Sequence, residues 1–279
     1  MKVTLWGARG SLPDAGPELV RYGGNTSCVQ IVGSDGTQLM LDAGTGTRRL
    51  GVSIAKAKRV DVLLTHFHMD HVQGLGFFAP LFNPEADVRI WGPPSTTMSL
   101  HQRLTRYLSP PLFPVRLRDF DCKLTLKDAP RGAFTIGELR VEADLVCHPN
   151  PTLGYRITDG RSTVVYLPDH EVALGCPDFP HSAEWTSGYA LARGADLLIH
   201  DTQYDDKEYE EHVGWGHCSL NQAVAFAELV GAKRLVTFHH DPAHDDESLD
   251  GLVAKAKEQV NGGVEVIGGK EGATFDLAA

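Results

Sequence analysis

Four side chains that can bind metal ions lie within six residues of the sequence: His66, His68, Asp70 and His71. They follow residues 60–64, an apolar run with the length and β-branched content of a buried strand. Because alternate side chains of an extended segment point the same way, His66 and His68 can reach one metal ion from one side. A turn after Met69 would direct Asp70 and His71 towards a second ion. Imidazole and carboxylate ligands suit zinc, and also iron or manganese.

The spacing H-x-H-x-D-H resembles the signature of the metallo-β-lactamase superfamily, and the resemblance extends from Val3 to about Phe275. It implies an α/β fold of four layers, an αββα sandwich in which two mixed sheets face each other and helices lie outside. We find no linker or repeat, so we expect one domain over residues 1–279. The fold hosts lactamases, thioesterases, lactonases, nucleases and phosphodiesterases, so the motif alone does not identify a substrate.

The same resemblance implies the remaining metal ligands. The family's third histidine falls at His148, and the carboxylate that bridges both metals falls at Asp169. The last ligand follows the apolar run 235–238 and is His239 by family register, with His240 as the alternative. The side chains of these two neighbours cannot both enter one site from an extended strand.

The resemblance also implies that Asp42 and the pair Asp201–His217 support this site. Asp42 follows a strand at the place where the family has a buried aspartate that braces the ligand loop, as metal-bound histidines require. By position, Asp201 would orient His217, and His217 would act as a general acid. The alternative is that His217 only precedes a helix capped by Ser219.

The complete set predicts a site for two divalent metal ions, zinc by preference, with manganese or iron as alternatives. The expected ligands are His66, His68 and His148 for the first ion, Asp70, His71 and His239 for the second, and Asp169 with a solvent hydroxide between them. With neutral histidines, the two ions, two carboxylates and one hydroxide leave a net charge of about +1, which attracts a phosphodiester anion. The hydroxide is the expected nucleophile. We expect Asp70, Asp201 and His217 to be the catalytic residues, because an alkoxide leaving group needs a proton.

The expected function is hydrolysis of a small nucleotide-like or cyclic phosphate diester. The first alternative is a ribonuclease Z-like nuclease. The second is a thioesterase or lactonase, in which His217 would be dispensable, and the third is a metal-binding sensor without turnover. Ribonuclease Z enzymes of bacteria carry a long basic arm between the residues corresponding to His148 and Asp169, and residues 149–168 leave no room for one.

Composition narrows the class of protein. The 279 residues are 42% hydrophobic and 22% charged, as in soluble globular proteins. No apolar run approaches the roughly 18 residues of a membrane span, and no signal peptide is recognisable. The five cysteines show no C-x-x-C spacing, which favours reduced thiols and a cytoplasmic location. A formal net charge of −10 disfavours a nucleic-acid partner. Among similar proteins, dimers are common.

The hydrophobic pattern predicts the elements that position these residues. Strands are expected at 3–6, 28–32, 38–41, 60–64, 88–91, 155–158, 163–167, 195–199, 235–238, 264–267 and 274–277. Three further strands, at 124–126, 134–136 and 139–143, are expected in the second sheet. Helices are expected from Ser95 as N-cap, at 183–193, at 220–230 with Ser219 and Gln222 as capping box, and at 245–260.

Overall fold

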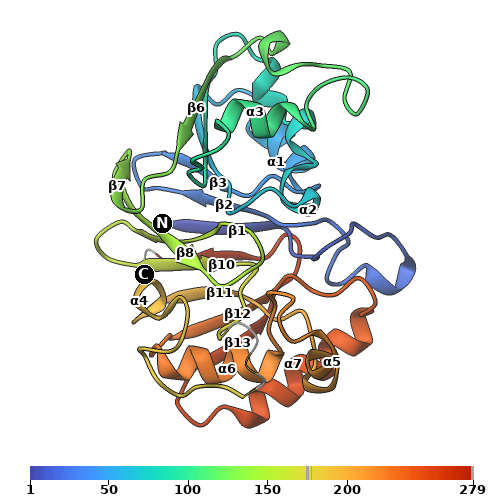
Figure 1. Ribbon diagram of the computed structural model, residues 1–279, viewed down its shortest axis with the longest axis vertical. Coiled ribbons are helices and arrows are strands. Elements are labelled where there is room, and N and C mark those ends of the chain that lie inside the picture. The colour runs from blue at the N-terminus through green and yellow to red at the C-terminus, as the bar shows by residue number, and fades with distance from the viewer. Residues whose placement is uncertain (174–175, 177, 278–279) are drawn as a thin grey trace.

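Two seven-stranded mixed sheets form the centre of the computed structural model, which describes residues 1–173, 176 and 178–277 (Figure 1). In spatial order, the first sheet contains β14 (Thr274–Asp276), β1 (Lys2–Gly7), β2 (Cys28–Val32), β3 (Gln38–Leu41), β4 (Arg59–Leu63), β5 (Asp87–Gly92) and β6 (Lys123–Asp128). The second sheet contains β13 (Glu265–Gly268), β12 (Arg234–Phe238), β11 (Leu197–Asp201), β10 (Thr163–Leu167), β9 (Thr152–Thr158), β8 (Leu139–Val146) and β7 (Gly132–Ile136).

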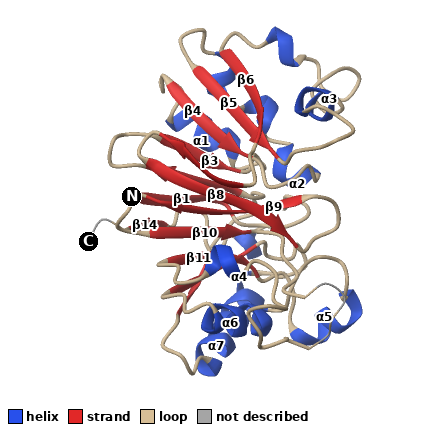
Figure 2. Cartoon of the chain, turned by 60° about the vertical axis from the view of Figure 1, so that its left-hand side comes forward, coloured by secondary structure: helices blue, strands red, loops and turns tan. Residues whose placement is uncertain are grey.

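Helices cover the outer face of each sheet, which confirms the expected four-layer αββα sandwich (Figures 1 and 2). The helices near the first sheet are α1 (Thr47–Ser53), α2 (Met69–Val72) and α3 (Leu100–Thr105). Those near the second sheet are α4 (Tyr189–Ala192), α5 (Asp206–His212), α6 (Leu220–Leu229) and α7 (Asp246–Gln259). Short 3-10 helices occur at Pro17–Leu19, Leu75–Phe77, Ala79–Phe82 and Leu117–Asp119. Among the described residues, no helix combines the length and the apolar character needed to cross a membrane.

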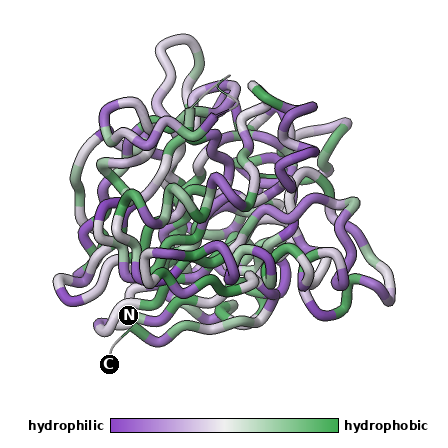
Figure 3. Tube along the Cα trace, turned by 90° about the horizontal axis from the view of Figure 1, so that it is seen from below, coloured by the Kyte–Doolittle hydropathy of each residue, from purple (hydrophilic) through white to green (hydrophobic). Residues whose placement is uncertain are grey.

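Alternation along the strands divides the apolar side chains among three clusters. In β3, Leu39 and Leu41 join the cluster between the sheets, whereas Met40 packs on the outer side with Leu50 of α1. This is the two-residue period of a strand buried on both faces. In Figure 3 the hydrophobic stretches lie mostly in the middle of the trace and the hydrophilic ones mostly along its outline. The two sheets are therefore held together by a continuous apolar core.

Both sheets contain runs of parallel strands whose carboxyl ends meet at one edge of the sandwich. Strands β3 to β6 are parallel in the first sheet, and β10 to β13 are parallel in the second. The candidate ligands follow the ends of β4, β8, β10 and β12. In open α/β sheets this edge is the usual place for a functional site.

Two predictions about the segment after β5 are wrong. Residues 124–126 lie in β6 of the first sheet, not in the second, because β6 continues the parallel run beside β5. The next helix begins after Ser99, which forms a capping box with Gln102. Each of these two side chains accepts a hydrogen bond from the backbone N–H of the other residue. Ser95 instead accepts hydrogen bonds from the backbone N–H groups of Thr97 and Met98 in a tight turn.

The helix predicted at 183–193 is shorter in the structure, where only Tyr189–Ala192 is α-helical. Gly188 has a left-handed backbone (φ 71°), which separates α4 from the preceding turns. The backbone N–H of Ser187 bonds to the carbonyl of Val172 in another segment. Tertiary hydrogen bonding therefore replaces the helix that the composition favoured. The expected helices α6 and α7 form, with Ser219 and Asp245 as N-caps.

Candidate metal centre

Side chains from four strand ends and one helix converge on a buried cluster. His66 and His68 lie after β4, and Asp70 and His71 lie in α2 directly behind them. The other members come from the second sheet and are His148 after β8, Asp169 after β10 and His239 after β12. The structure thus brings together all seven residues that the sequence suggested as ligands.

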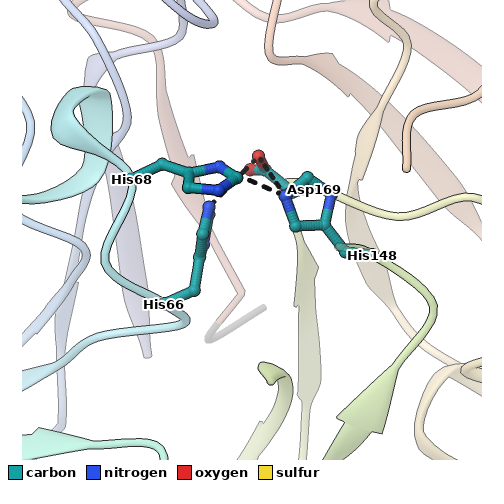
Figure 4. A group of neighbouring side chains, drawn as sticks. All are labelled: His66, His68, His148 and Asp169. Carbon is teal, nitrogen blue, oxygen red and sulfur yellow. Dashed lines mark hydrogen bonds and ion pairs between the residues drawn. The ribbon is translucent and has the colours of Figure 1, made fainter. Parts of the chain in front are cut away.

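One half of the cluster consists of His66, His68, His148 and one oxygen of Asp169 (Figure 4). His68 Nδ1 lies 3.3 Å from His148 Nε2. Asp169 Oδ2 lies 3.5 Å from His66 Nε2 and 3.7 Å from His148 Nε2. Figure 4 shows the carboxylate approached by His66 and His68 on one side and by His148 on the other.

The other half consists of Asp70, His71 and His239. Asp70 Oδ2 lies 3.2 Å from His71 Nε2 and 3.1 Å from His239 Nε2, and these two nitrogens are 3.4 Å apart. Asp169 completes this half through its second oxygen, since Oδ1 lies 2.9 Å from His71 Nε2 and 3.4 Å from His239 Nε2. One carboxylate therefore presents one oxygen to each half, as a bridging ligand must.

These distances are compatible with bound metal ions. Nitrogen and oxygen atoms bound to zinc at about 2.0–2.1 Å in a tetrahedron lie about 3.3–3.4 Å from one another. The ligand-atom separations above scatter around this spacing. His66 Nε2 is fully buried and has no hydrogen-bond partner among the described residues, and a nitrogen in that position needs a ligand. The donor set of imidazoles and carboxylates therefore fits divalent metal ions, and it fits zinc well.

The pKa shifts of the clustered side chains also favour the binding of cations. Burial and the neighbouring histidines lower the pKa of His66 well below its usual value, so this imidazole is neutral and can act as a ligand. Burial opposes charge on His239, but Asp169 and Asp70 outweigh it and raise the pKa of His239 to about 9. Burial likewise opposes charge on Asp169, but His239 and His71 hold its pKa well below the usual range. The carboxylates thus draw positive charge into this buried space.

Asp42 supports the cluster from behind. Its Oδ2 accepts a hydrogen bond from His71 Nδ1 at 2.8 Å, and its oxygens also accept from the Thr65 backbone N–H (2.7 Å) and the Tyr166 hydroxyl (3.0 Å). Asp42 is fully buried at the end of β3. This contact fixes the tautomer of His71, so that Nε2 carries the lone pair that faces the cluster.

We expect Asp42→Asn to weaken zinc binding by about 10- to 100-fold, the usual cost of losing an outer hydrogen-bond partner of a ligand histidine. The amide would set an N–H group against donors that now meet a carboxylate. Competition with a chromophoric chelator measures the affinity. Asp144→Asn is a matched control, because this carboxylate is half exposed and pairs with Arg131. Equal affinities for the two variants would contradict the supporting role of Asp42.

His217 lies beside the cluster and is held by Asp201. His217 Nδ1 is 2.6 Å from Asp201 Oδ2, and Asp201 is fully buried at the end of β11. The imidazole stacks on that of His239 with ring centroids 4.9 Å apart. One of its ligand atoms lies within 4.8 Å of ligand atoms of Asp169 and His239. The arrangement leaves an oriented imidazole at the edge of the metal cluster.

Backbone geometry places His239 in the cluster and His240 outside it. His239 has a left-handed backbone (φ 60°), which is uncommon for a residue other than glycine and ends the alternation of β12. His240 Nε2 instead contacts the carbonyl oxygen of Gly269 at 2.8 Å. His170, the neighbour of Asp169, also lies outside, with its Nδ1 2.8 Å from His200 Nε2.

Several supporting residues were missed by the sequence reasoning. Gln203 Oε1 accepts a hydrogen bond from His239 Nδ1 at 2.9 Å, and the Ser11 backbone N–H donates to Asp70 Oδ2 at 2.8 Å. A Cβ atom on Gly10 would collide with the His239 ring, so the glycine-rich turn after β1 is needed for close approach. The sequence offered one indication of the role of Gln203, which is that it lies two residues after Asp201.

Glu171 is a further buried carboxylate that the sequence reasoning did not assign. It follows Asp169 by two residues and is fully buried. It accepts hydrogen bonds from the backbone N–H groups of Gly214 (2.9 Å) and Gly216 (3.0 Å). The carbonyl oxygen of Gly216 lies 2.9 Å from His148 Nδ1, and His217 comes next in the chain. Glu171 therefore fixes the loop that supports a candidate ligand and the candidate acid.

Sequence comparisons find a matching family and similar proteins. The family model described as "Beta-lactamase superfamily domain" matches residues 37–240. A relative named ribonuclease Z, from Myxococcus xanthus (strain DK1622), is 27% identical over 273 residues, covering 82% of this chain and 85% of the relative.

Two solved structures share the fold over nearly the whole chain. The metallo-β-lactamase fold protein YhfI from Bacillus subtilis has a TM-score of 0.72 and 22% identity, and the alignment covers 99% of each chain. A structure described as a new diphosphatase from the PhnP family has a TM-score of 0.67 and 18% identity, and the alignment covers 99% of this chain and 97% of the other.

Proposed function

Since the chain belongs to the β-lactamase superfamily and is a metal-dependent hydrolase, we propose that its substrate is a small phosphodiester and that its site holds two metal ions, zinc by preference. His66, His68 and His148 would hold the first ion, and Asp70, His71 and His239 the second. Asp169 would bridge them, because each of its oxygens faces one half of the cluster. When bound, the ions lower the pKa of a water molecule and withdraw charge from the phosphoryl group.

The observation that carries the proposal is the His217–Asp201 pair at the edge of the cluster. Asp201 accepts a hydrogen bond from Nδ1 of His217 and orients the imidazole, whose other ring nitrogen can pass a proton to a leaving oxygen. An alkoxide is a poor leaving group and needs that proton. A thioester needs such a donor less, because a thiolate leaves without protonation, so a thioesterase would not require this pair.

The size of the loops supports a small substrate. The interval between His148 and Asp169 contains the β9–β10 hairpin and short connections. A basic arm of the kind expected for holding tRNA would have to start in this interval, and the hairpin takes up most of residues 149–168. The proposed substrate is therefore a nucleotide-like or cyclic phosphate diester.

RNA is the second candidate substrate. The comparisons do not support the prediction, drawn from the net charge, that a nucleic-acid partner is disfavoured. The relative from Myxococcus xanthus is named ribonuclease Z and aligns over 82% of this chain. A phosphodiester within RNA needs the same nucleophile and the same proton donor. Short single-stranded RNA therefore belongs in any test of activity.

A comparison of four substrates tests the proposal. The zinc-loaded protein is assayed with bis-p-nitrophenyl phosphate, a cyclic nucleotide, a thioester and a short RNA, before and after treatment with a chelator. We expect hydrolysis of the phosphodiesters, loss of activity after chelation and recovery on adding zinc. Turnover of the thioester alone would reject the proposal. Cleavage of RNA without cleavage of the small diesters would replace the first substrate by the second.

A further inference from the structure

A cavity of about 560 Å³ lies beside the metal cluster, and we call it the α3 cavity. Its walls come from residues 66–69, 94–95, 97–98, 103–104 and 106–107, together with Val72, Leu112, Asn150 and Pro151. It shares Phe67, His68 and Met69 with the cleft of about 420 Å³ that exposes Asp70, Asp169 and His217. A molecule whose phosphate lies over the cluster can therefore extend past Phe67 and Met69 into the α3 cavity. Volumes of this size are typical of small-molecule sites.

The wall of the α3 cavity is apolar with two cations. Met98, Leu104 and Leu112 contribute aliphatic surface, and Arg103 and Arg106 bring positive charge. A purely aliphatic occupant would not use the arginines, whereas a second phosphate group would be desolvated against the aliphatic side chains. A planar heterocycle with acceptor atoms suits both kinds of wall, because arginine stacks on aromatic faces and donates to acceptors in the ring plane.

Arg103 shows that one wall already has this character. Its guanidinium lies 4.6 Å from the centroid of the Phe67 ring, so cation and aromatic face are in contact. Its side chain is only 12% exposed, and it pairs at 3.3 Å with the carboxylate of Asp128, which is half exposed. Arg103 Nε is buried and has no hydrogen-bond partner among the described residues. A buried, weakly compensated cation of this kind is stabilised by an electron-rich ligand.

We propose that the α3 cavity binds the base of a nucleoside phosphodiester whose phosphate lies over the metal cluster. The inference rests on the proposed function, since the phosphate is placed by the phosphodiesterase site. It makes the substrate a nucleotide in particular, and it assigns recognition of the base to the segment 94–112.

Binding of AMP and of ribose 5-phosphate to the zinc-loaded protein tests this proposal by titration calorimetry. The two probes differ only in the base. We expect AMP to bind at least about tenfold more tightly, in line with the usual contribution of one stacked base. Equal dissociation constants for the two probes in the wild-type protein would overturn the proposal.

Two neighbouring threonines provide matched variants. Thr97 is exposed and lines the α3 cavity, so Thr97→Trp should fill it and bring the AMP preference down to about that of ribose 5-phosphate. Thr96 is also exposed and is absent from the lining, so Thr96→Trp should keep the full preference. Leu112→Trp fills the cavity from another loop and should act like Thr97→Trp. A preference that survives both filling variants would overturn the proposal.

The binding measurement separates this inference from the proposed reaction. Selective AMP binding by a protein that hydrolyses no diester would keep the nucleoside site and reject the phosphodiesterase. Hydrolysis of small diesters without any AMP preference would keep the phosphodiesterase and reject the nucleoside site.

Discussion

Replacing Asp169 with alanine is expected to lower the bound metal from about two ions per chain to one or fewer, because one carboxylate faces both halves of the cluster. The remaining histidines would lose the anion that binds the two halves together. Phosphodiester hydrolysis should fall on the order of 10³-fold or more, since an unactivated water has a pKa near 16 instead of about 7. Elemental analysis of the purified protein and initial rates with bis-p-nitrophenyl phosphate are the two measurements.

The control for this prediction is Asp121→Ala, which removes an exposed carboxylate far from the cluster in sequence. It should retain the metal content of the wild-type protein. Asp169→Asn should give an intermediate metal content, because the amide keeps one oxygen ligand and loses the charge. Full metal occupancy in Asp169→Ala would show that this residue does not bridge the two halves.

Replacing His217 with alanine is expected to slow the hydrolysis of alkyl phosphodiesters by about 10²- to 10⁴-fold, the range for losing a general acid. Nitrophenyl diesters should be affected far less, because nitrophenolate leaves without protonation. The ratio of kcat/KM for the two substrate classes isolates the proton donor from effects on binding. Metal content should stay near that of the wild-type protein.

His212→Ala is the matched control, since His212 stacks on Tyr204 near the same loop and is not among the clustered ligand residues. It should slow both classes of diester equally and slightly. Equal losses for the two classes in His217→Ala would remove the general-acid role. A large loss of metal in His217→Ala would instead show that His217 is a metal ligand. This alternative needs a test because His217 stacks on His239.

The elements next to the site were the most predictable part of the fold. The run 60–64 and the ligands that follow it are a local pattern, and β4 forms where that pattern indicates, whereas α2 occupies the place of the expected turn. Short apolar runs bounded by turn residues also identified β2, β3 and β10 closely. The alternation of these strands depends on neighbouring residues only, so one sequence carries the information.

Features that depend on distant residues were not predictable. Residues 124–126 read as a strand, but which sheet they join is decided by pairing with β5. The left-handed backbone of His239, which turns its ring into the cluster, has no signature in the pair His239-His240. The supporting roles of Gln203 and Ser11 were also not predictable, because their contacts with His239 and Asp70 exist only after both sheets assemble.

The buried carboxylate of Glu171 holds one loop that supports both the proposed ligand His148 and the proposed proton donor His217. By holding Gly214 and Gly216 it aligns the carbonyl that meets His148, and the next residue is His217. The proposed ligand His148 and the proposed proton donor His217 thus depend on one loop that Glu171 holds. A change that releases this loop should displace His148 and His217 together. Metal binding through His148 and proton donation by His217 would then be lost at the same time.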